Sequence, residues 1–186
     1  VHTTDATVPD NAATALIHQD LADRDLAPAR HYLDSGYPSV PNMLAARREH
    51  DIMMITPLLG DSSRQTKTGG GYSRDQFTID YDTRTATCPQ GQKSATWNHG
   101  VHDGIEKIYI TFPQRACWTC DAQPECTTSK ARQRGLTIYP RELHEIQQAA
   151  RTAQGTKSWR ADYQRRAGIE GTMNQAANTV GRRKAR

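Results

Sequence analysis

The four cysteines of this chain lie close together in the sequence, between positions 88 and 126. Cys117 and Cys120 are separated by two residues, Cys126 follows after five more, and Cys88 opens a Cys-Pro-Gln-Gly turn. Zinc prefers thiolate ligands at ~2.3 Å in closed tetrahedral sites, and a small β segment with little core gains stability from such a site. We therefore predict that Cys88, Cys117, Cys120 and Cys126 bind a structural Zn²⁺.

Two other interpretations of the cysteines stay open, namely a pair of disulfides and four ordinary buried thiols. The N-terminus, Val1 to Asp5, has no initiator Met and no apolar segment of the kind that signals secretion, so it indicates a cut through a longer polypeptide. Reducing conditions inside a cell disfavour disulfides. His99 and His102 lie between the cysteines in sequence and are able to replace one of them as ligand, although we expect both in a loop.

Composition limits the size of the core and the class of the protein. Hydrophobic residues make up 35% of the 186 residues, below the roughly 45–50% of average soluble domains. No run of 18 apolar residues is present, which excludes a membrane span by sequence. The formal net charge is +4, a mild bias that is compatible with nucleic-acid binding without requiring it.

Basic residues are concentrated near the C-terminus. From Arg151 to Arg186 there are nine basic and two acidic residues, and the end of the chain carries Arg182, Arg183 and Lys184. Such a cluster is suited to contacts with phosphate groups, but a solvated helix end or a tail has the same composition.

The order of apolar patterns predicts an α/β fold with an inserted β-rich segment. We expect a helix over 11–26 capped by Asp10 or Asn11, a strand over 31–34, a helix over 40–49, and a buried strand over 52–55. A polar, glycine-ending hinge over 60–71 leads into short strands at 77–81, 85–87, 105–112 and 136–139. Helices are expected over 141–153 and 158–178. These patterns divide the chain into core segments 1–59 and 140–186, with the insert at 60–139.

Two acidic residues stand in places that suit metal binding. Asp34 is the last residue of the strand expected at 31–34, and carboxylates at that end of a strand are well placed for ligand binding. Glu170 follows Tyr163 and Arg166 at a spacing that puts all three on one helical face. Taken separately, Asp34 is more typical of a helix cap or a turn. Tyr163, Arg166 and Glu170, taken separately, are more typical of a surface ion pair.

The chain resembles the C-terminal half of the catalytic core of DDE-class insertion-sequence transposases in three features that follow one another in the same order. These are Leu33-Asp34-Ser35-Gly36-Tyr37, the cysteine insert, and Tyr163-x2-Arg166-x3-Glu170-Gly171-Thr172. The resemblance covers nearly the whole chain. It implies a partial RNase H-like core interrupted by the insert, with Asp34 as the second and Glu170 as the third acidic residue of the catalytic triad. Tyr163 and Arg166 match flanking residues of the family and are expected to contact DNA phosphate or support the acidic side chains, as are Arg182, Arg183 and Lys184.

The resemblance also implies a mechanism and its partners. Mg²⁺ or Mn²⁺ bound by Asp34 and Glu170 would serve cleavage and strand transfer of DNA during transposition. The expected partners are transposon ends, target DNA and a second copy of the chain, in the bacterial cytoplasm at the nucleoid. A non-catalytic DNA-binding remnant and a zinc-ribbon interaction module are the alternatives.

The sequence departs from the family pattern at several points. Ala177 stands where the family often has Lys. The first Asp of the triad is expected upstream of the matching segments, because Asp5 lies in a polar lead-in and we interpret Asp10 as a helix cap. The segment that follows Arg186 in the family is missing as well. We therefore expect a fragment with little or no activity by itself.

Overall fold

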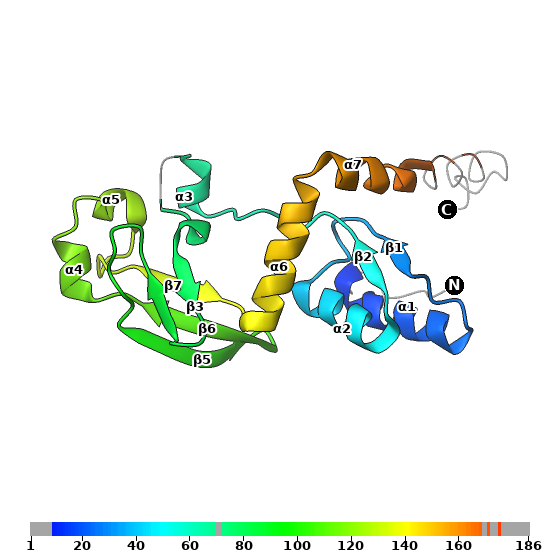
Figure 1. Ribbon diagram of the computed structural model, residues 1–186, viewed down its shortest axis with the longest axis horizontal. Coiled ribbons are helices and arrows are strands. Elements are labelled where there is room, and N and C mark those ends of the chain that lie inside the picture. Colours follow the sequence, from blue (N-terminus) through cyan, green and yellow to red (C-terminus); the bar gives the residue numbers. More distant parts are fainter. Residues whose placement is uncertain (1–8, 70–71, 169–170, 172–174, 176–186) are drawn as a thin grey trace, which may run out of the picture. The chain divides into compact units, whose positions relative to one another are not determined.

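The computed structural model describes residues 9–69, 72–168, 171 and 175 (Figure 1). It divides into two compact units, which are described separately. Unit 1 comprises Val1–Leu58 and Ile146–Arg186, and unit 2 comprises Leu59–Glu145. Helix α6 (Arg141–Gln154) begins in unit 2 and ends in unit 1.

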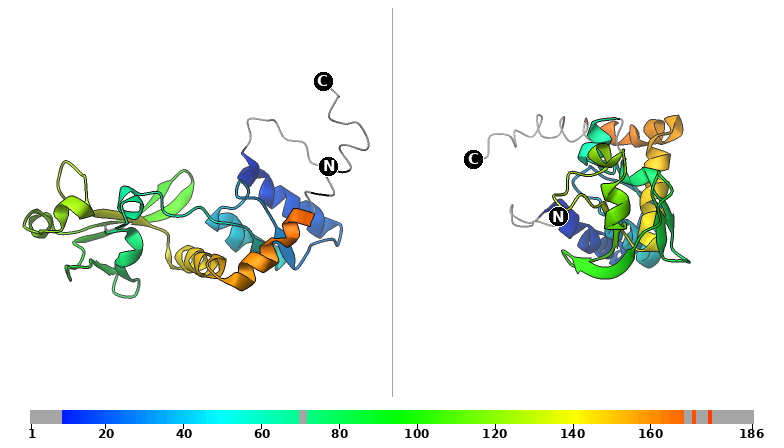
Figure 2. Two further views of the ribbon diagram at one scale, coloured as in Figure 1. Left: turned by 90° about the horizontal axis from the view of Figure 1, so that it is seen from above. Right: turned by 90° about the vertical axis from the view of Figure 1, so that its left-hand side faces the viewer.

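Unit 1 has the helix-strand-helix-strand order that the sequence predicts. Helix α1 (Asp10–Asp23), strand β1 (Arg30–Tyr32), helix α2 (Val40–His50) and strand β2 (Met53–Ile55) follow one another, and helix α7 (Lys157–Tyr163) comes later in the chain. The two strands pair in parallel, from Arg30 opposite Met53 to Tyr32 opposite Ile55. Figure 2 shows this unit from above, with α7 in orange beside the blue and cyan segments.

Local side-chain chemistry sets the ends of α2. The Ser39 side chain accepts a hydrogen bond from the Asn42 amide at 3.2 Å, which satisfies a free amide of the first turn. Pro41 fits in the first turn because its missing N–H is not needed there. At the other end Asp51 adopts a left-handed conformation with φ of 52°, and the chain turns directly into β2.

The core of unit 1 is small. Leu33, Ala46, Ile52 and Met54 are buried together, and Tyr37 and Met43 pack against them. The prediction that 52–55 is a strand buried on both faces is wrong in one respect, because the Met53 side chain in β2 is 46% exposed. A two-stranded sheet has only part of each face covered, so a continuous apolar run is not fully buried here.

Unit 2 consists of short strands and helical turns. Its elements are α3 (Arg64–Lys67), the 3₁₀ turn η1 (Arg74–Gln76), β3 (Thr78–Asp80), β4 (Thr85–Thr87), β5 (Thr96–His102), β6 (Ile105–Thr111), α4 (Gln114–Trp118), α5 (Gln123–Cys126) and β7 (Gly135–Ile138). Strands β3 and β4 form an antiparallel hairpin, and β5, β6 and β7 form an antiparallel sheet in that order.

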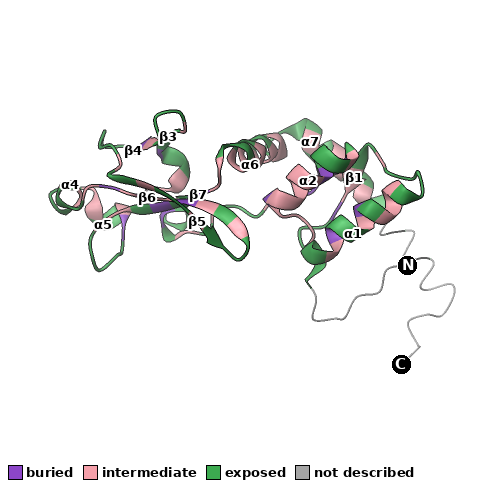
Figure 3. Ribbon diagram, turned by 90° about the horizontal axis from the view of Figure 1, so that it is seen from below, coloured by how far each residue is buried: buried purple, intermediate pink, exposed green. Residues whose placement is uncertain are grey.

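Alternation along β6 builds the core of unit 2. Its inward side chains Ile108 and Ile110 are at most 2% exposed, as is Phe112, which follows the strand. They pack with Phe77, Ala86, Leu136 and Ile138, and Figure 3 shows buried residues along β6 and β7. One face of the sheet β5–β6–β7 therefore provides much of the core of unit 2.

Several elements differ from those expected. His99 and His102, which we expect in a loop, both lie on strand β5. Its sequence lacks regular apolar alternation, and its seven-residue pairing with β6 supplies the order instead. A short helix, α3, occupies part of the expected hinge, and the Ser63 side chain accepts a hydrogen bond from the Thr66 amide at its start.

Two helix ends also differ from the prediction. Helix α1 begins at Asp10 with Pro9 at the N-cap, so the expected cap at Asp10 or Asn11 is wrong. Proline fits there because the extended backbone before a helix matches its fixed φ. The single helix expected over 158–178 is interrupted, because α7 ends at Tyr163 and Gln164 forms a turn before the helical residues 165–168.

Among the described helices, none has the length and apolar character needed to span a membrane.

A buried histidine links the first three elements of unit 1. His18 of α1 is 1% exposed, and its Nε2 lies 2.9 Å from Nδ1 of His31 on β1. The ring of His50, at the end of α2, lies 6.1 Å from the His18 ring. Burial first, and then the neighbouring His31 and His50, lower the pKa of His18 to about 4 from 6.5.

This cluster predicts a loss of stability in mild acid. Below pH 6.5 the unfolded chain protonates His18 while the folded chain resists, so the free energy of unfolding falls until about pH 4, by up to about 3 kcal/mol. His18→Gln keeps an amide that reaches His31 but does not titrate, and it removes this part of the pH dependence. Urea unfolding of both proteins at pH 7.5 and 4.5 measures the difference. Equal losses in the two proteins would contradict the prediction.

Candidate active site and cysteine cavity

Asp34 lies in a fixed turn directly beyond β1. The Leu33 amide donates to the carbonyl of Ile55 at 3.1 Å, which continues the strand pairing up to this point. The buried Thr56 hydroxyl donates to the Asp34 carbonyl at 3.1 Å, and the Tyr37 amide donates to the same carbonyl at 3.2 Å. The backbone is therefore held while the Asp34 side chain remains 55% exposed.

Residues 130 positions later in the chain come to this turn. The Tyr163 hydroxyl donates to the Leu33 carbonyl at 3.2 Å, and Arg166 donates to the Tyr163 hydroxyl at 3.2 Å. The Arg166 guanidinium also lies 3.2 Å from the Asp34 carboxylate. Tyr163 stacks on Trp159 of α7, with ring centroids 5.0 Å apart and planes at 14°. Three of the residues singled out from the sequence are thus in direct contact.

Asp162 supports this contact and was not found by sequence reasoning. Its side chain is 14% exposed and accepts hydrogen bonds from Tyr32 at 2.9 Å and from Arg30. Arg165 lies 3.6 Å away. Because Tyr32 and Arg30 belong to β1, this carboxylate attaches α7 to the strand that leads to Asp34. No motif in the sequence distinguishes it from a surface aspartate.

A second carboxylate lies against the Asp34 turn. A Cβ atom at Gly36 would stand 3.1 Å from a carboxylate oxygen of Asp10. The absence of a side chain at Gly36 therefore lets the first residue of α1 approach the turn. Sequence reasoning assigned Asp10 to a helix cap and missed this proximity.

Several predicted site residues lie outside the described part of the chain. These are Glu170, Arg182, Arg183 and Lys184, and the same holds for Asp5 and Ala177. Their predicted roles stay predictions.

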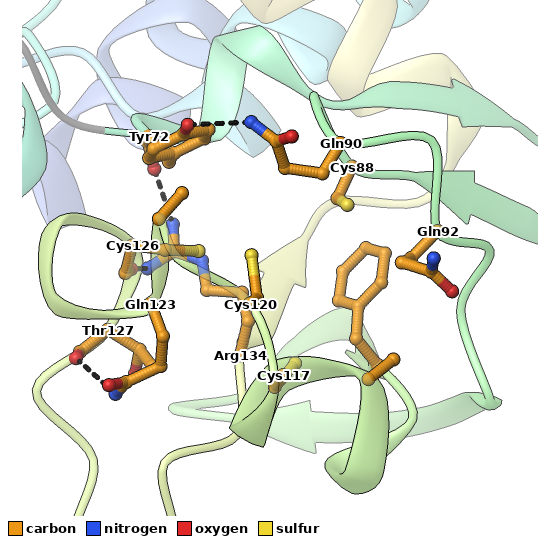
Figure 4. Close-up of a pocket in the computed structure, with 13 residues that line it drawn as sticks. Tyr72, Cys88, Gln90, Gln92, Cys117, Cys120, Gln123, Cys126, Thr127 and Arg134 are labelled. Carbon is orange, nitrogen blue, oxygen red and sulfur yellow. Dashed lines mark hydrogen bonds between the residues drawn. The ribbon is translucent and has the colours of Figure 1, made fainter.

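All four cysteines line one cavity in unit 2. Cys88 directly follows β4, Cys117 lies on α4, Cys126 ends α5, and Cys120 lies between these two helices. The cavity has a volume of about 30 Å³, more than the ~10–15 Å³ that one water needs. Figure 4 shows the four side chains around it. All four are free thiols.

Local geometry explains how the chain brings these thiols together. The Gly91 amide donates to the Cys88 carbonyl at 2.8 Å, and the Cys88 amide donates to the Gln92 carbonyl at 2.9 Å. This tight turn requires a positive φ of 79° at Gly91, which glycine adopts without strain. On the opposite side Arg134 donates to the Cys126 carbonyl at 3.0 Å and to the Tyr72 carbonyl at 3.2 Å.

The other three thiols affect the pKa of Cys126, and the four side chains are not arranged as a closed metal site. Burial raises the pKa of Cys126; the Arg134 guanidinium opposes this shift, and Cys117, Cys88 and Cys120 add to it. Within the described ranges, no group of three or more His, Cys, Asp or Glu side chains is arranged to hold a metal ion. His99 lines a different hollow, with Tyr81 and Trp97, and His102 pairs with Asp103.

The family comparison decides the class of the protein. The family described as transposase DDE domain matches residues 87–186, more than half of the chain. The chain belongs to this family. No curated protein and no solved structure gives a match.

The match locates the transposase DDE domain relative to the two sites. Residues 87–186 include all four cysteines, Tyr163, Arg166 and Glu170, whereas Asp34 and its strand lie upstream of them. The family membership confirms the resemblance drawn from the motifs, and the mixed helices and small sheets agree with an α/β fold. The contact between Asp34 and Arg166 therefore connects the matched segment to an acidic residue outside it.

We predict that Asp162 stabilises the candidate active site of this transposase DDE domain. Asp162→Ala removes a carboxylate that accepts two hydrogen bonds, and we expect a loss of about 2 kcal/mol in the local stability of α7. Asp20→Ala is the matched control, because the Asp20–Arg24 pair is exposed and such pairs contribute ~0.5 kcal/mol or less. Amide hydrogen exchange in β1 and α7 measures both effects. Similar protection in the two variants would show that Asp162 is not an anchor.

Proposed function

We propose that this chain takes part in Mg²⁺-dependent cleavage and strand transfer of DNA, with Asp34 and Glu170 as metal-binding carboxylates. The observation that carries the proposal is the 3.2 Å contact between Asp34 and Arg166. Glu170 follows Arg166 by four residues in the sequence. The family membership supplies the transposase class.

The chemistry of the residues around Asp34 suits hard cations. Mg²⁺ prefers oxygen ligands and commonly uses one or two carboxylates. The Asp34 carboxylate is exposed, and Asp10 brings a second carboxylate to the same turn. A pair of divalent ions supplies an activated water or 3′-hydroxyl and stabilises the leaving oxygen. The described residues do not complete such a site, so Glu170 and a further acidic residue belong to the proposal.

The side chains around Asp34 hold it in place. Tyr163 fixes α7 to the carbonyl before Asp34, and Arg166 balances the Asp34 charge until a cation binds. The planar guanidinium of Arg166 matches carboxylate and phosphate oxygens equally well. Arg166 is thereby suited to exchange Asp34 for a DNA phosphate when Asp34 binds metal.

The remaining features of the proposal concern fold and partners. Parallel pairing of β1 with β2 through the intervening α2 supports a partial RNase H-like core. Arg182, Arg183 and Lys184 would contact DNA phosphates. The homodimer and the location at the bacterial nucleoid remain predictions of the family resemblance.

We expect Asp34→Asn and Glu170→Gln to abolish strand cleavage while DNA binding persists, in an enzyme that carries all three acidic residues. Asn and Gln keep the side-chain shape but lose the charge that two divalent ions need. Asp20→Asn changes a half-exposed residue of α1 and should leave the cleavage rate at that of the parent. The assay follows cleavage of labelled transposon ends with Mg²⁺ or Mn²⁺. Cleavage by either active-site variant would remove that residue from the catalytic set.

We also propose that the cysteine cavity binds one structural Zn²⁺. Four thiols on one small cavity form the donor set that zinc prefers. Their arrangement is not closed, so binding would draw the side chains inward. Because Cys88, Cys117 and Cys126 pack against the core of unit 2, the ion would join the β4 turn to helices α4 and α5.

Zinc content and thermal stability test this site. The purified chain should hold about one zinc per molecule, and chelation should lower its unfolding temperature, since the binding free energy is part of the folding free energy. Cys120→Ser should lose the metal, whereas Thr119→Ser, at the neighbouring exposed position, should keep it. Zinc-free protein with four reactive thiols and an unchanged unfolding temperature would show ordinary buried thiols instead.

A further inference from the structure

Beside the cysteine cavity, α4 and the turn at 129–132 form an exposed surface. The Trp118 indole N–H donates to the Ala131 carbonyl at 3.0 Å, and the Gln114 amide donates to the same carbonyl at 3.2 Å. The turn is closed by the Arg132 amide, which donates to the Ser129 carbonyl at 2.8 Å. These bonds fix the turn against the helix.

The Trp118 ring is left partly uncovered on this surface. Its side chain is 49% exposed although it belongs to the segment Cys117–Cys120. Trp97, the other tryptophan of unit 2, packs against the core instead. A large ring that is held by its N–H and open on the outside is a platform for another flat group.

Three basic residues lie on the same helix as this ring or on the turn that its N–H contacts. Arg115 precedes Trp118 by three residues on α4, which places both on one side of the helix, and Lys130 and Arg132 flank Ala131. All three are exposed, and their side chains form no ion pair or hydrogen bond with the described part of the chain. Residues 113–134 carry four basic and two acidic residues. We call Arg115, Trp118, Lys130 and Arg132 the knuckle surface.

We propose that the knuckle surface binds DNA, with Arg115, Lys130 and Arg132 on backbone phosphates and Trp118 stacked on an unpaired base. Unpaired cations suit phosphates, and an exposed indole suits the face of a base irrespective of sequence. The inference rests on the proposed function, which makes DNA the substrate. It assigns DNA contact to unit 2, separately from the acidic residues of unit 1.

Salt dependence tests the cationic part. In the full chain, Arg115, Lys130 and Arg132 are changed together to Ser, and binding to a labelled duplex is measured by anisotropy at several salt concentrations. Loss of three phosphate contacts reduces the slope of log K against log salt by about 2.7. The matched control changes Arg64, Lys67 and Lys93 to Ser, which removes the same charge from exposed, unpaired positions of unit 2. Its slope should stay near that of the parent.

Trp118 is tested with a single strand and the same duplex. Trp118→Ala should weaken single-strand binding about tenfold and duplex binding little, because stacking needs an unpaired base. Trp118→Phe keeps a stacking face but lacks the indole N–H, and it should retain most of the affinity. If Phe and Ala weaken binding equally, the effect comes from loss of the bond to Ala131, and the stacking role is wrong.

The outcomes separate this inference from the proposed function. A parent chain that binds neither DNA overturns both. A parent that binds DNA while the triple Ser variant keeps the parent slope overturns the knuckle surface alone. Equal slope changes in the triple variant and its control also overturn it, since general charge would then explain binding. Circular dichroism of each variant confirms that its fold is retained.

Discussion

The attachment of α7 to β1 organises the candidate active site. Two neighbouring residues on the helix act in different ways: the Asp162 carboxylate accepts hydrogen bonds from side chains of the strand, and the Tyr163 hydroxyl donates to its backbone. Both bonds join residues that lie 130 positions apart, so forming them carries the entropic cost of closing a long chain segment. Arg166 reaches Asp34 only because this attachment is made.

Sequence predicted elements whose pattern is local. The strand expected over 105–112 and the helix expected over 40–49 rest on patterns of a few consecutive residues, and both elements form where expected. Strand β5 has no such pattern, because its order comes from pairing with β6. For Met53 the local pattern predicts burial, but the side chain is exposed because the sheet around it is small. A few consecutive residues do not reveal which distant strands will pair or how large the resulting sheet will be.

The candidate site follows the same rule. Asp34, Tyr163 and Arg166 belong to short sequence motifs, and the family resemblance predicts that they form one site. Asp162 and Asp10 belong to no motif, and only the fold brings them to β1 and to the turn at Gly36. The cysteines are intermediate, because their spacing predicts a shared cavity but not how closely the thiols approach.

The nesting of the two units has a consequence for synthesis on the ribosome. Unit 2 is one continuous segment, whereas unit 1 is formed by segments on both sides of it. Domains fold as units while the chain emerges. Unit 2 is therefore free to fold as soon as residue 145 has left the exit tunnel. The contact between Asp34 and Arg166 forms only after the later residues have emerged as well. The nascent chain therefore completes the cysteine cavity before Arg166 can contact Asp34, and a chain that stalls between these points would lack an assembled candidate active site.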